Sequence, residues 1–561
     1  MRLLMMACLP LSLAACAAPV RDASAPAAQV NVIEVAPAGR DQETAAWWFR
    51  AGAAAAAGNG AMQGRAKNVI VFLGDGMSLT TVAAARILQG QQRGEPGEEN
   101  ALAFEQLPYT ALSKTYNTDT QTPDSAGTMS AIATGVKTRA GVISIGQSAA
   151  LGDCAGALAA PMLTLWELAG AAGLSTGVVS TARVTHATPG ATFSHSANRD
   201  WENDSALPDT AQAAGCRDIA WQMIQSPFGN GPDVLIGGGR SQFMPAAQHD
   251  PEYDDKVGQR QDGRDLIAAW KQRHPGGAYA WNAEQFAAAP ADAALLALFE
   301  PSHMHYEHDR AADRAGEPSL AQMTRAAITR LQRDADGYVL LVEGARIDHA
   351  NHEGNAYRAL TDTIAMSDAV QAAMQLTSAS DTLILVTADH SHTLSFVGYP
   401  ARGNPILGKV RENTDTPGAP PQLALDALGL PYATLNYSNG PGYPGASAKQ
   451  PAGAKTYPHA ASGYRPAAGR PDLGQVDTTD PDYLQEALVP MGDETHGGED
   501  VGVWARGPGA AAVRGTIEQN VIFHLLVQST PALRARLCQA GTCNAEGVPV
   551  ELPSPGDFMA K

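Results

Sequence analysis

NVIVFLGDGM, residues 68–77, contains an unbroken apolar run followed by Asp75, an acid that lies between two glycines. A short apolar run that ends at glycine predicts a strand buried on both faces, as in a parallel sheet. LTTVAAARILQ, residues 79–89, follows and reads as a helix. The order strand, turn, helix places Asp75 beyond the carboxyl end of its strand, where open α/β sheets bind their ligands.

The same arrangement recurs along the chain. Apolar runs predict strands at STGVVST (175–181), YVLLVEG (338–344) and TLILVTADH (382–390), with a helix at 319–332 and another after Glu353. This alternation predicts an α/β fold, namely a doubly wound, mostly parallel central sheet with helices on both faces. Glu343, Asp389 and His390 end such strands, so they should gather with Asp75 at one edge of the sheet.

The segments outside this pattern differ in composition. We expect a signal peptide over residues 1–16, a tether over 17–40, an N-terminal helix within 41–60 with Asp41 as N-cap and Gly58 as its end, one large domain over 61–543, and a polar tail over 544–561. Trp47, Trp48 and Phe49 should pack on the body or on a second subunit. Residues 400–475 are dense in Gly, Pro, Tyr and Ala. They read as a loop-rich insertion that affects partners or substrate access, although the composition fits a disordered linker equally well.

Charge and the N-terminus bear on partners and location. The formal net charge of −18 argues against nucleic acid as a main partner. Arg2, an apolar run and LAAC ending at Cys16 predict an export signal. The LAAC ending resembles a bacterial lipoprotein box, which predicts a lipid anchor at Cys16 and a periplasmic or cell-envelope location. An ordinary secretory signal cleaved near Ala18 is the alternative. The apolar run after Arg2 is shorter than the ~20 apolar residues that span a bilayer, so a transmembrane anchor is disfavoured.

The remaining cysteines are even in number. Apart from Cys8 and Cys16, the chain has Cys154, Cys216, Cys538 and Cys543. In an exported chain this suggests two disulfides. Cys538 and Cys543 are close enough to close a short loop, which leaves Cys154 for Cys216. A zinc site made by these cysteines is disfavoured because no CxxC pair is present.

Several short motifs carry residues that bind metal ions. Asp348 and His352 are spaced i, i+4, so both can reach one ion if the segment is helical. This pair, the Asp389–His390 pair and His496 form mixed Asp/His sets that suit zinc. A second set contains only oxygen ligands, which suits magnesium with waters completing the shell. Its members are Asp75, Thr188 and Glu343.

Ser125 and Arg199 are the candidate catalytic residues. Ser125 lies in TPDSAGT directly before a helical stretch, and a helix N-terminus stabilises developing negative charge. In isolation Ser125 or Asp124 would be read as a helix cap, but the surrounding metal ligands favour a nucleophile, since zinc lowers the pKa of a bound hydroxyl group. Arg199, in SANRDW, carries a guanidinium that matches two phosphate oxygens.

These motifs closely resemble the alkaline phosphatase family. The resemblance runs from about Asp41 to Cys543 and is nearer to the vertebrate branch than to the enteric bacterial enzyme. It is carried by SANRDW, GCRDIAWQMI, DVLIGGGR, DPEYDD, LVEGARIDHANHEG, TADHSHTLSF, NYSNGPGY and ETHGGEDV. It implies hydrolysis of small phosphate monoesters through a phosphoserine, with two zinc ions and one magnesium ion, in a homodimer.

The resemblance also implies roles for individual residues. One zinc would be held by Asp348, His352 and His496, and the other by Asp75, Asp389, His390 and ionised Ser125. Asp75 would bridge to the magnesium bound by Thr188 and Glu343. Arg199 would clamp the phosphate. His186 and His349 would act through water, and His392 would orient a zinc carboxylate. The cysteine pairs Cys154–Cys216 and Cys538–Cys543 match the family.

The vertebrate branch carries a further, calcium-like site. Its pattern matches Glu252, the backbone of Phe299, Glu300 and Glu317, the last of which is usually Asp there. This departure from the pattern weakens the expectation of a calcium ion.

Two other functions compete with this interpretation. A diesterase or sulfatase of the same superfamily is disfavoured, since DSAGT lacks the C/S-x-P-x-R context of sulfatases and Arg199 would meet the third oxygen of a monoester. A metal-rigidified phosphate-binding lipoprotein without turnover is disfavoured because every expected ligand is present.

Overall fold

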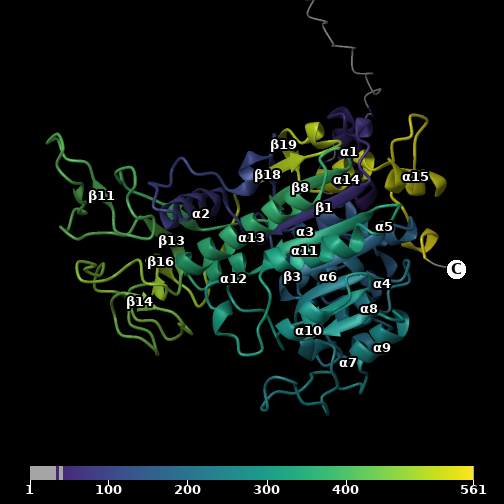
Figure 1. The fold of residues 1–561 in the computed structure, drawn as a ribbon, viewed down its shortest axis with the longest axis horizontal. Helices are drawn as coiled ribbons and strands as arrows, with labels where there is room; N and C mark the ends of the chain where they lie inside the picture. The colour runs from purple at the N-terminus through teal and green to yellow at the C-terminus, as the bar shows by residue number, and fades with distance from the viewer. Residues whose placement is uncertain (1–32, 34, 37–38, 40–41, 560–561) are drawn as a thin grey trace, which may run out of the picture.

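The computed structural model describes residues 33, 35–36, 39 and 42–559 (Figure 1). The signal segment, Cys16, most of the tether and Asp41 lie outside the described residues. A ten-stranded sheet forms the centre, in the order β19-β2-β18-β8-β1-β7-β3-β4-β6-β5. Its strands are β1 Asn68–Gly74, β2 Tyr109–Lys114, β3 Ser175–Arg183, β4 Val234–Gly238, β5 Ala278–Ala280, β6 Leu295–Leu298, β7 Tyr338–Gly344, β8 Thr382–Ala388, β18 Val501–Arg506 and β19 Gly515–Glu518.

The strands predicted from the sequence form the middle of this sheet. β8, β1, β7 and β3 are adjacent and parallel, and β4, β6 and β5 extend the parallel run. β18 is antiparallel to both of its neighbours, β8 and β2, and β19 runs parallel to β2. The prediction of a mostly parallel sheet is therefore confirmed.

Helices cover both faces of the sheet, which explains the unbroken apolar strands. In β1, Val69, Val71 and Leu73 belong to one buried cluster, while Ile70 and Phe72 belong to the cluster on the opposite face. The first cluster includes residues of α1 Ala45–Gly58, α3 Ser125–Thr134, α5 Leu165–Ala171, α6 Ala187–Phe193, α8 Ile219–Ile224, α9 Leu266–Arg273, α14 Val521–Ser529 and α15 Pro531–Gln539. The second includes residues of α2 Leu79–Gln92, α11 Leu320–Leu331, α12 Arg346–His352 and α13 Ala356–Leu376.

The N-terminal helix packs on the body of its own chain. α1 begins at Ala45 after the N-cap Thr44, whose side chain accepts from the Trp47 backbone N–H, so the expected start at Asp41 is corrected. The ring of Phe49 lies 5.9 Å from that of Phe523 in α14. The final segment, expected as a polar tail, also packs: Val548 and Val550 are buried against α1.

Residues 400–475 contain short strands joined by loops. β10 Leu394–Phe396, β13 Leu435–Gly440 and β16 Ala487–Pro490 make a three-stranded sheet, and β11 Arg411–Glu412 pairs with β12 Gln422–Leu423. β14 Lys455–Thr456 pairs with β15 Tyr483–Leu484. This region projects at the left of Figure 1. Within the described residues, no helix is both long and apolar enough to cross a membrane.

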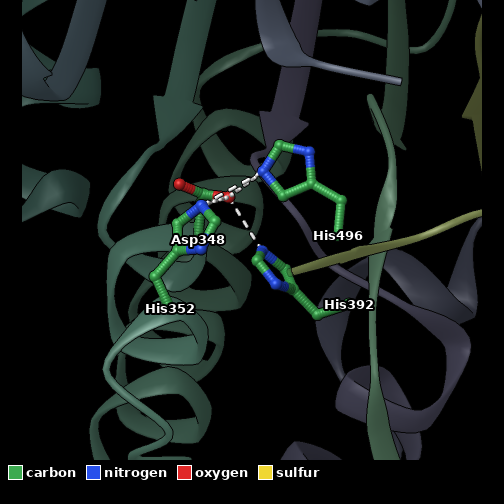
Figure 2. A group of neighbouring side chains, drawn as sticks. All are labelled: Asp348, His352, His392 and His496. Atoms are coloured by element: carbon green, nitrogen blue, oxygen red, sulfur yellow. Dashed lines mark hydrogen bonds and ion pairs between the residues drawn. The ribbon is translucent and has the colours of Figure 1, made fainter. Parts of the chain in front are cut away.

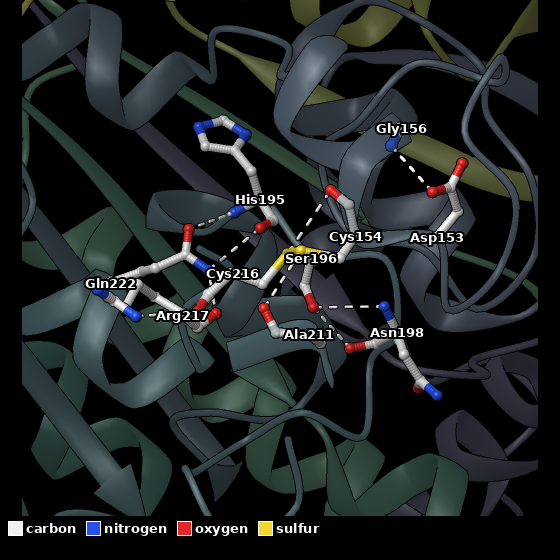
Figure 3. The surroundings of a disulfide bond; sticks show 10 residues. All are labelled: Asp153, Cys154, Gly156, His195, Ser196, Asn198, Ala211, Cys216, Arg217 and Gln222. Carbon is white, nitrogen blue, oxygen red and sulfur yellow. Dashed lines mark hydrogen bonds between the residues drawn. A yellow bond between two sulfur atoms is a disulfide. The ribbon is translucent and has the colours of Figure 1, made fainter. Parts of the chain in front are cut away.

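The part of the chain that the structure describes contains two disulfides, in the pairing expected from the family. Cys154, at the start of α4 Cys154–Ala159, is joined to Cys216 after α7 Asp209–Ala213 (Figure 3). The chain between them contains the segment that carries Arg199. Cys538 and Cys543 close a short loop at the end of α15.

Candidate metal and phosphate site

The first group of site residues lies at the ends of adjacent strands. Asp75 follows β1, Glu343 lies near the end of β7, and Asp389 follows β8. The register pairs Leu73 with Glu343 and Gly74 with Ala388, so the three carboxylates meet at one edge of the sheet. They gather at the carboxyl ends of parallel strands, as the sequence predicted.

A second group surrounds Asp348 (Figure 2). Asp348 and His352 lie on one face of α12, with Asp348 Oδ1 3.4 Å from His352 Nε2. The same oxygen is 3.4 Å from His496 Nε2 and 2.8 Å from His392 Nε2. His496 and His392 are opposite each other in a two-stranded pairing of β17 His496–Gly497 with β9 Ser391–His392. Residues from three distant parts of the chain thus converge on one carboxylate.

His392 differs from the other two imidazoles in this group. Its Nδ1 contacts Glu494 Oε2 and its Nε2 contacts Asp348 Oδ1. Burial lowers its pKa, but Glu494 and Asp348 outweigh burial and raise the pKa to about 10. A protonated imidazole held between two carboxylates has no free lone pair for a metal ion. The geometry therefore fits a residue that orients Asp348.

Ser125 lies beside the remaining Asp/His group. Its Oγ is 3.1 Å from His390 Nε2 and 3.3 Å from Asp75 Oδ1. His390 Nε2 is also 3.3 Å from Asp75 Oδ1 and 3.4 Å from Asp389 Oδ2. Ser125 is the first residue of α3, and Asp124 is the N-cap that accepts from the Gly127 N–H. Asp124 thus caps the helix, while the Ser125 hydroxyl faces His390 and Asp75.

Three buried oxygens nearby lack hydrogen-bond partners. They are Asp75 Oδ2, Thr188 Oγ1 and Glu343 Oε1. Buried polar atoms rarely stay unpaired, so a hard cation fits these oxygens. Burial raises the pKa of Glu343 to about 8, and burial together with Asp389, Asp348 and Glu343 raises the pKa of Asp75 well above its usual value. So many buried carboxylates in one place require positive charge.

Asp348 is the exception among these carboxylates. Burial would raise its pKa, yet His352, His392 and His496 hold the pKa well below its usual value. Asp348 is therefore the carboxylate best suited to remain ionised.

Arg199 is fixed from two sides. Its Nη1 donates to Asp124 Oδ2 at 3.2 Å and its Nη2 lies 3.2 Å from His186 Nε2. Asp124 Oδ2 also accepts from the Gly141 N–H at 2.9 Å. The cap of the Ser125 helix thus also aligns the guanidinium.

His186 and His349 belong to a cluster whose third member, His303, the sequence analysis missed. Arg183 Nη1 lies 2.6 Å from His303 Nε2, and Arg346 Nη1 lies 2.9 Å from His349 Nδ1. Burial and the neighbouring arginines lower the pKa of His186 and His349, so both are neutral. His303 follows the apolar strand β6 within FEPSHMH, the same strand-then-acid pattern that identified the other sites.

Comparison with known proteins shows to which family the chain belongs. The family model described as alkaline phosphatase matches residues 66–531. The chain belongs to the alkaline phosphatase family. It is 42% identical over 474 residues to the tissue-nonspecific alkaline phosphatase of Gallus gallus, covering 83% of this chain and 84% of that protein. It is 40% identical over 502 residues to the rat tissue-nonspecific isozyme, with 88% of each chain covered. The expected likeness to the vertebrate branch is confirmed.

Solved alkaline phosphatase structures share the fold. The enzyme of the Antarctic bacterium TAB5 superposes with a TM-score of 0.52 at 20% identity and covers 83% of this chain and 98% of its own. The Thermus thermophilus alkaline phosphatase gives a TM-score of 0.57 at 23% identity, with 84% and 92% covered. At this identity the likeness concerns the fold alone.

Proposed function

We propose that this protein is an alkaline phosphatase that hydrolyses phosphate monoesters through a phosphoserine at Ser125. The observation that carries the proposal is the position of Ser125 Oγ, at a helix N-terminus and within 3.3 Å of both His390 and Asp75. A nucleophile beside metal-ligand groups and a guanidinium is the arrangement that phosphoryl transfer requires.

The residues present fit two zinc ions and one magnesium ion. Asp348, His352 and His496 would hold one zinc ion; Asp75, Asp389 and His390 would hold the other, beside Ser125. The unpaired oxygens of Asp75, Thr188 and Glu343 suit magnesium. When bound, these ions would supply positive charge that favours the ionised serine and the departing alkoxide.

The protein's own residues account for the remaining steps. Ser125 Oγ bonds to phosphorus as the ester P–O bond breaks, and the leaving oxygen departs and takes up a proton. A water molecule then attacks phosphorus, the P–Oγ bond breaks, and inorganic phosphate leaves with Ser125 restored. Through both steps Arg199, fixed by Asp124 and His186, would bind two phosphate oxygens and stabilise the charge of the transition state.

The decisive assay compares a monoester with a diester. We expect zinc- and magnesium-dependent hydrolysis of p-nitrophenyl phosphate at alkaline pH, abolished by EDTA, with little hydrolysis of bis-p-nitrophenyl phosphate. Preferred cleavage of the diester would assign the protein to the phosphodiesterases. Stoichiometric phosphate binding without turnover of either ester would indicate a binding protein.

We further propose an exported homodimer, lipid-anchored at Cys16 in the cell envelope. The signal motif supports export and lipidation. Large apolar side chains exposed on β16 and in the loops that follow β10 and precede β13 support a second copy as partner. They include Tyr399 at 88% exposure, Leu488 at 80% and Leu428 at 70%. Light scattering of the purified protein tests the dimer, and a Cys16→Ser variant released from membranes tests the anchor.

A further inference from the structure

Three histidines and three arginines form a cluster beside the proposed phosphate clamp. Each imidazole accepts an N–H from a different arginine: His186 Nε2 from Arg199 at 3.2 Å, His303 Nε2 from Arg183 at 2.6 Å, and His349 Nδ1 from Arg346 at 2.9 Å. A guanidinium only donates, so each of these ring nitrogens presents its lone pair to an arginine. Neighbouring positive charge and occupied lone pairs make the cluster unsuited to a metal ion and suited to an anion.

Arg346 differs from the other two arginines because it lacks a carboxylate partner. The other two are paired, Arg183 with Glu202 at 2.6 Å and Arg199 with Asp124 at 3.2 Å. Arg346 forms no salt bridge with any residue that the structure describes, and its guanidinium lies 3.7 Å from the ring centroid of the buried Tyr306. The ring holds the guanidinium in place without neutralising its charge.

Two buried N–H groups of the cluster have no acceptor. One is Arg346 Nε, and the other is His186 Nδ1, which carries the ring proton because Nε2 accepts from Arg199. Buried donors rarely stay unpaired, so a ligand that brings acceptor oxygens fits here. The side chains of Arg346, His349 and His303 are only partly buried, which leaves the cluster accessible.

The cluster extends from the clamp towards Asp348. The His186 ring, in contact with Arg199, lies 5.4 Å from the His349 ring, and His349 lies 4.2 Å from His303. His349 directly follows Asp348 on α12, and Asp348 belongs to the group proposed to favour departure of the alkoxide. An ester held by Arg199 would therefore have the cluster beside its leaving group.

We propose that Arg346 anchors a second anion subsite, which binds a carboxylate or other negatively charged oxygen group on the leaving group of the ester. The inference rests on the proposed phosphatase function and adds a preference among its substrates. A guanidinium fork matches two oxygens of such a group, and its contact with His349 fixes the direction of the fork. The protein's net charge of −18 repels anions, so tighter binding of a more anionic ligand requires local positive charge of this kind.

The subsite can be tested by binding, without turnover. Calorimetry on the zinc- and magnesium-loaded protein compares phenylphosphonate with its 3- and 4-carboxy derivatives, which are not hydrolysed and differ only in the added carboxylate. We expect the wild type to bind one of the carboxy derivatives about tenfold more tightly than phenylphosphonate, the size of one charge-assisted contact. In Arg346→Gln this ratio of dissociation constants should fall to about one, and Arg346→Lys, which keeps the charge, should retain part of it.

The matched control is Arg333→Gln, the same change at an exposed arginine after α11, which should keep the wild-type ratio. Equal affinity of the wild type for all three phosphonates would overturn the proposal, and this result needs no variant to fold. Equal weakening of all three by Arg346→Gln would also overturn it, because a purely structural arginine would act that way. Failure of the proposed function is distinguishable: the wild type would then not bind phenylphosphonate at all, which would overturn the clamp and the subsite together.

Discussion

At the scale of single residues, Ser125 and Arg199 carry distinct parts of the proposed chemistry. Ser125→Ala removes the atom that bonds to phosphorus, so we expect kcat to fall by about 10³-fold or more while inorganic phosphate and metals still bind. Steady-state kinetics together with metal analysis check this. A variant with wild-type turnover would show that the nucleophile lies elsewhere.

Arg199→Ala should act differently. Loss of a charge-assisted, two-pronged contact costs about 1.5–3 kcal/mol, which corresponds to roughly 10- to 150-fold weaker inhibition by inorganic phosphate. A diester lacks the third free oxygen, so its cleavage should fall less. Inhibition constants and both p-nitrophenyl substrates measure the difference, with Arg199→Lys as the control that keeps charge but not the fork. Equal losses on both esters would count against a phosphate clamp.

At the scale of elements, the start of α3 links helix capping to the proposed phosphate clamp, Arg199. Asp124 Oδ1 accepts from the Gly127 N–H, and Oδ2 holds Arg199. Asp124→Asn keeps a cap acceptor but places a donor before the guanidinium, so phosphate inhibition should weaken with little loss of stability. Asp124→Ala should also lose about 1 kcal/mol of stability with the cap. Denaturant unfolding and phosphate inhibition, measured on both variants, distinguish the two effects; tight phosphate binding by Asp124→Asn would refute the link.

The contact between α1 and α14 should confer sensitivity to acid. His524 of α14 is buried against Phe49 of α1, and burial lowers its pKa to about 3. As pH falls, the unfolded chain therefore takes up this proton at a higher pH than the folded protein does. The stability contributed by neutral His524 is fully present above pH ~6.5. Below that pH the free energy of unfolding falls by about 1.4 kcal/mol per pH unit until the folded pKa is reached. In the His524→Gln variant, the free energy of unfolding measured by urea denaturation should depend less steeply on pH between pH 4 and 6. Parallel curves for the variant and wild type would show that His524 does not titrate in this way.

At the scale of the whole molecule, the metals should be part of the folded structure. Asp75, Glu343 and Asp389 are fully buried and repel one another. Chelation should therefore lower the melting temperature, and zinc with magnesium should restore it. The pKa of Glu343 is raised to about 8 in the folded protein, so between about pH 5 and 8 this carboxyl group ionises in the unfolded chain but stays protonated in the fold. The metal-free protein should therefore lose stability as pH rises through this range. Calorimetry at both pH values tests this, and a melting temperature unaffected by EDTA would show that the fold does not depend on the ions.

Some features followed from the sequence alone because they depend on local periodicity. The apolar runs of β1, β3, β7 and β8, the i, i+4 pair on α12 and the acids at strand ends could be predicted, since strand and helix repeats are written in neighbouring residues. Parallel strands then bring Asp75, Glu343 and Asp389 to one edge.

Other features were decided only by tertiary structure, because they depend on contacts between residues far apart in the chain. The antiparallel β18 between β8 and β2, the union of His303 with His186 and His349, and the hold of Glu494 on His392 have no local signature. The N-cap of α1 is Thr44 and not the expected Asp41, which is likewise a feature that the structure decided. The contacts of the buried Arg240 guanidinium with the Phe299 carbonyl and with Glu252 likewise join residues that are far apart in the chain. Motif spacing thus determined which residues could meet, whereas packing decided which contacts each of them makes.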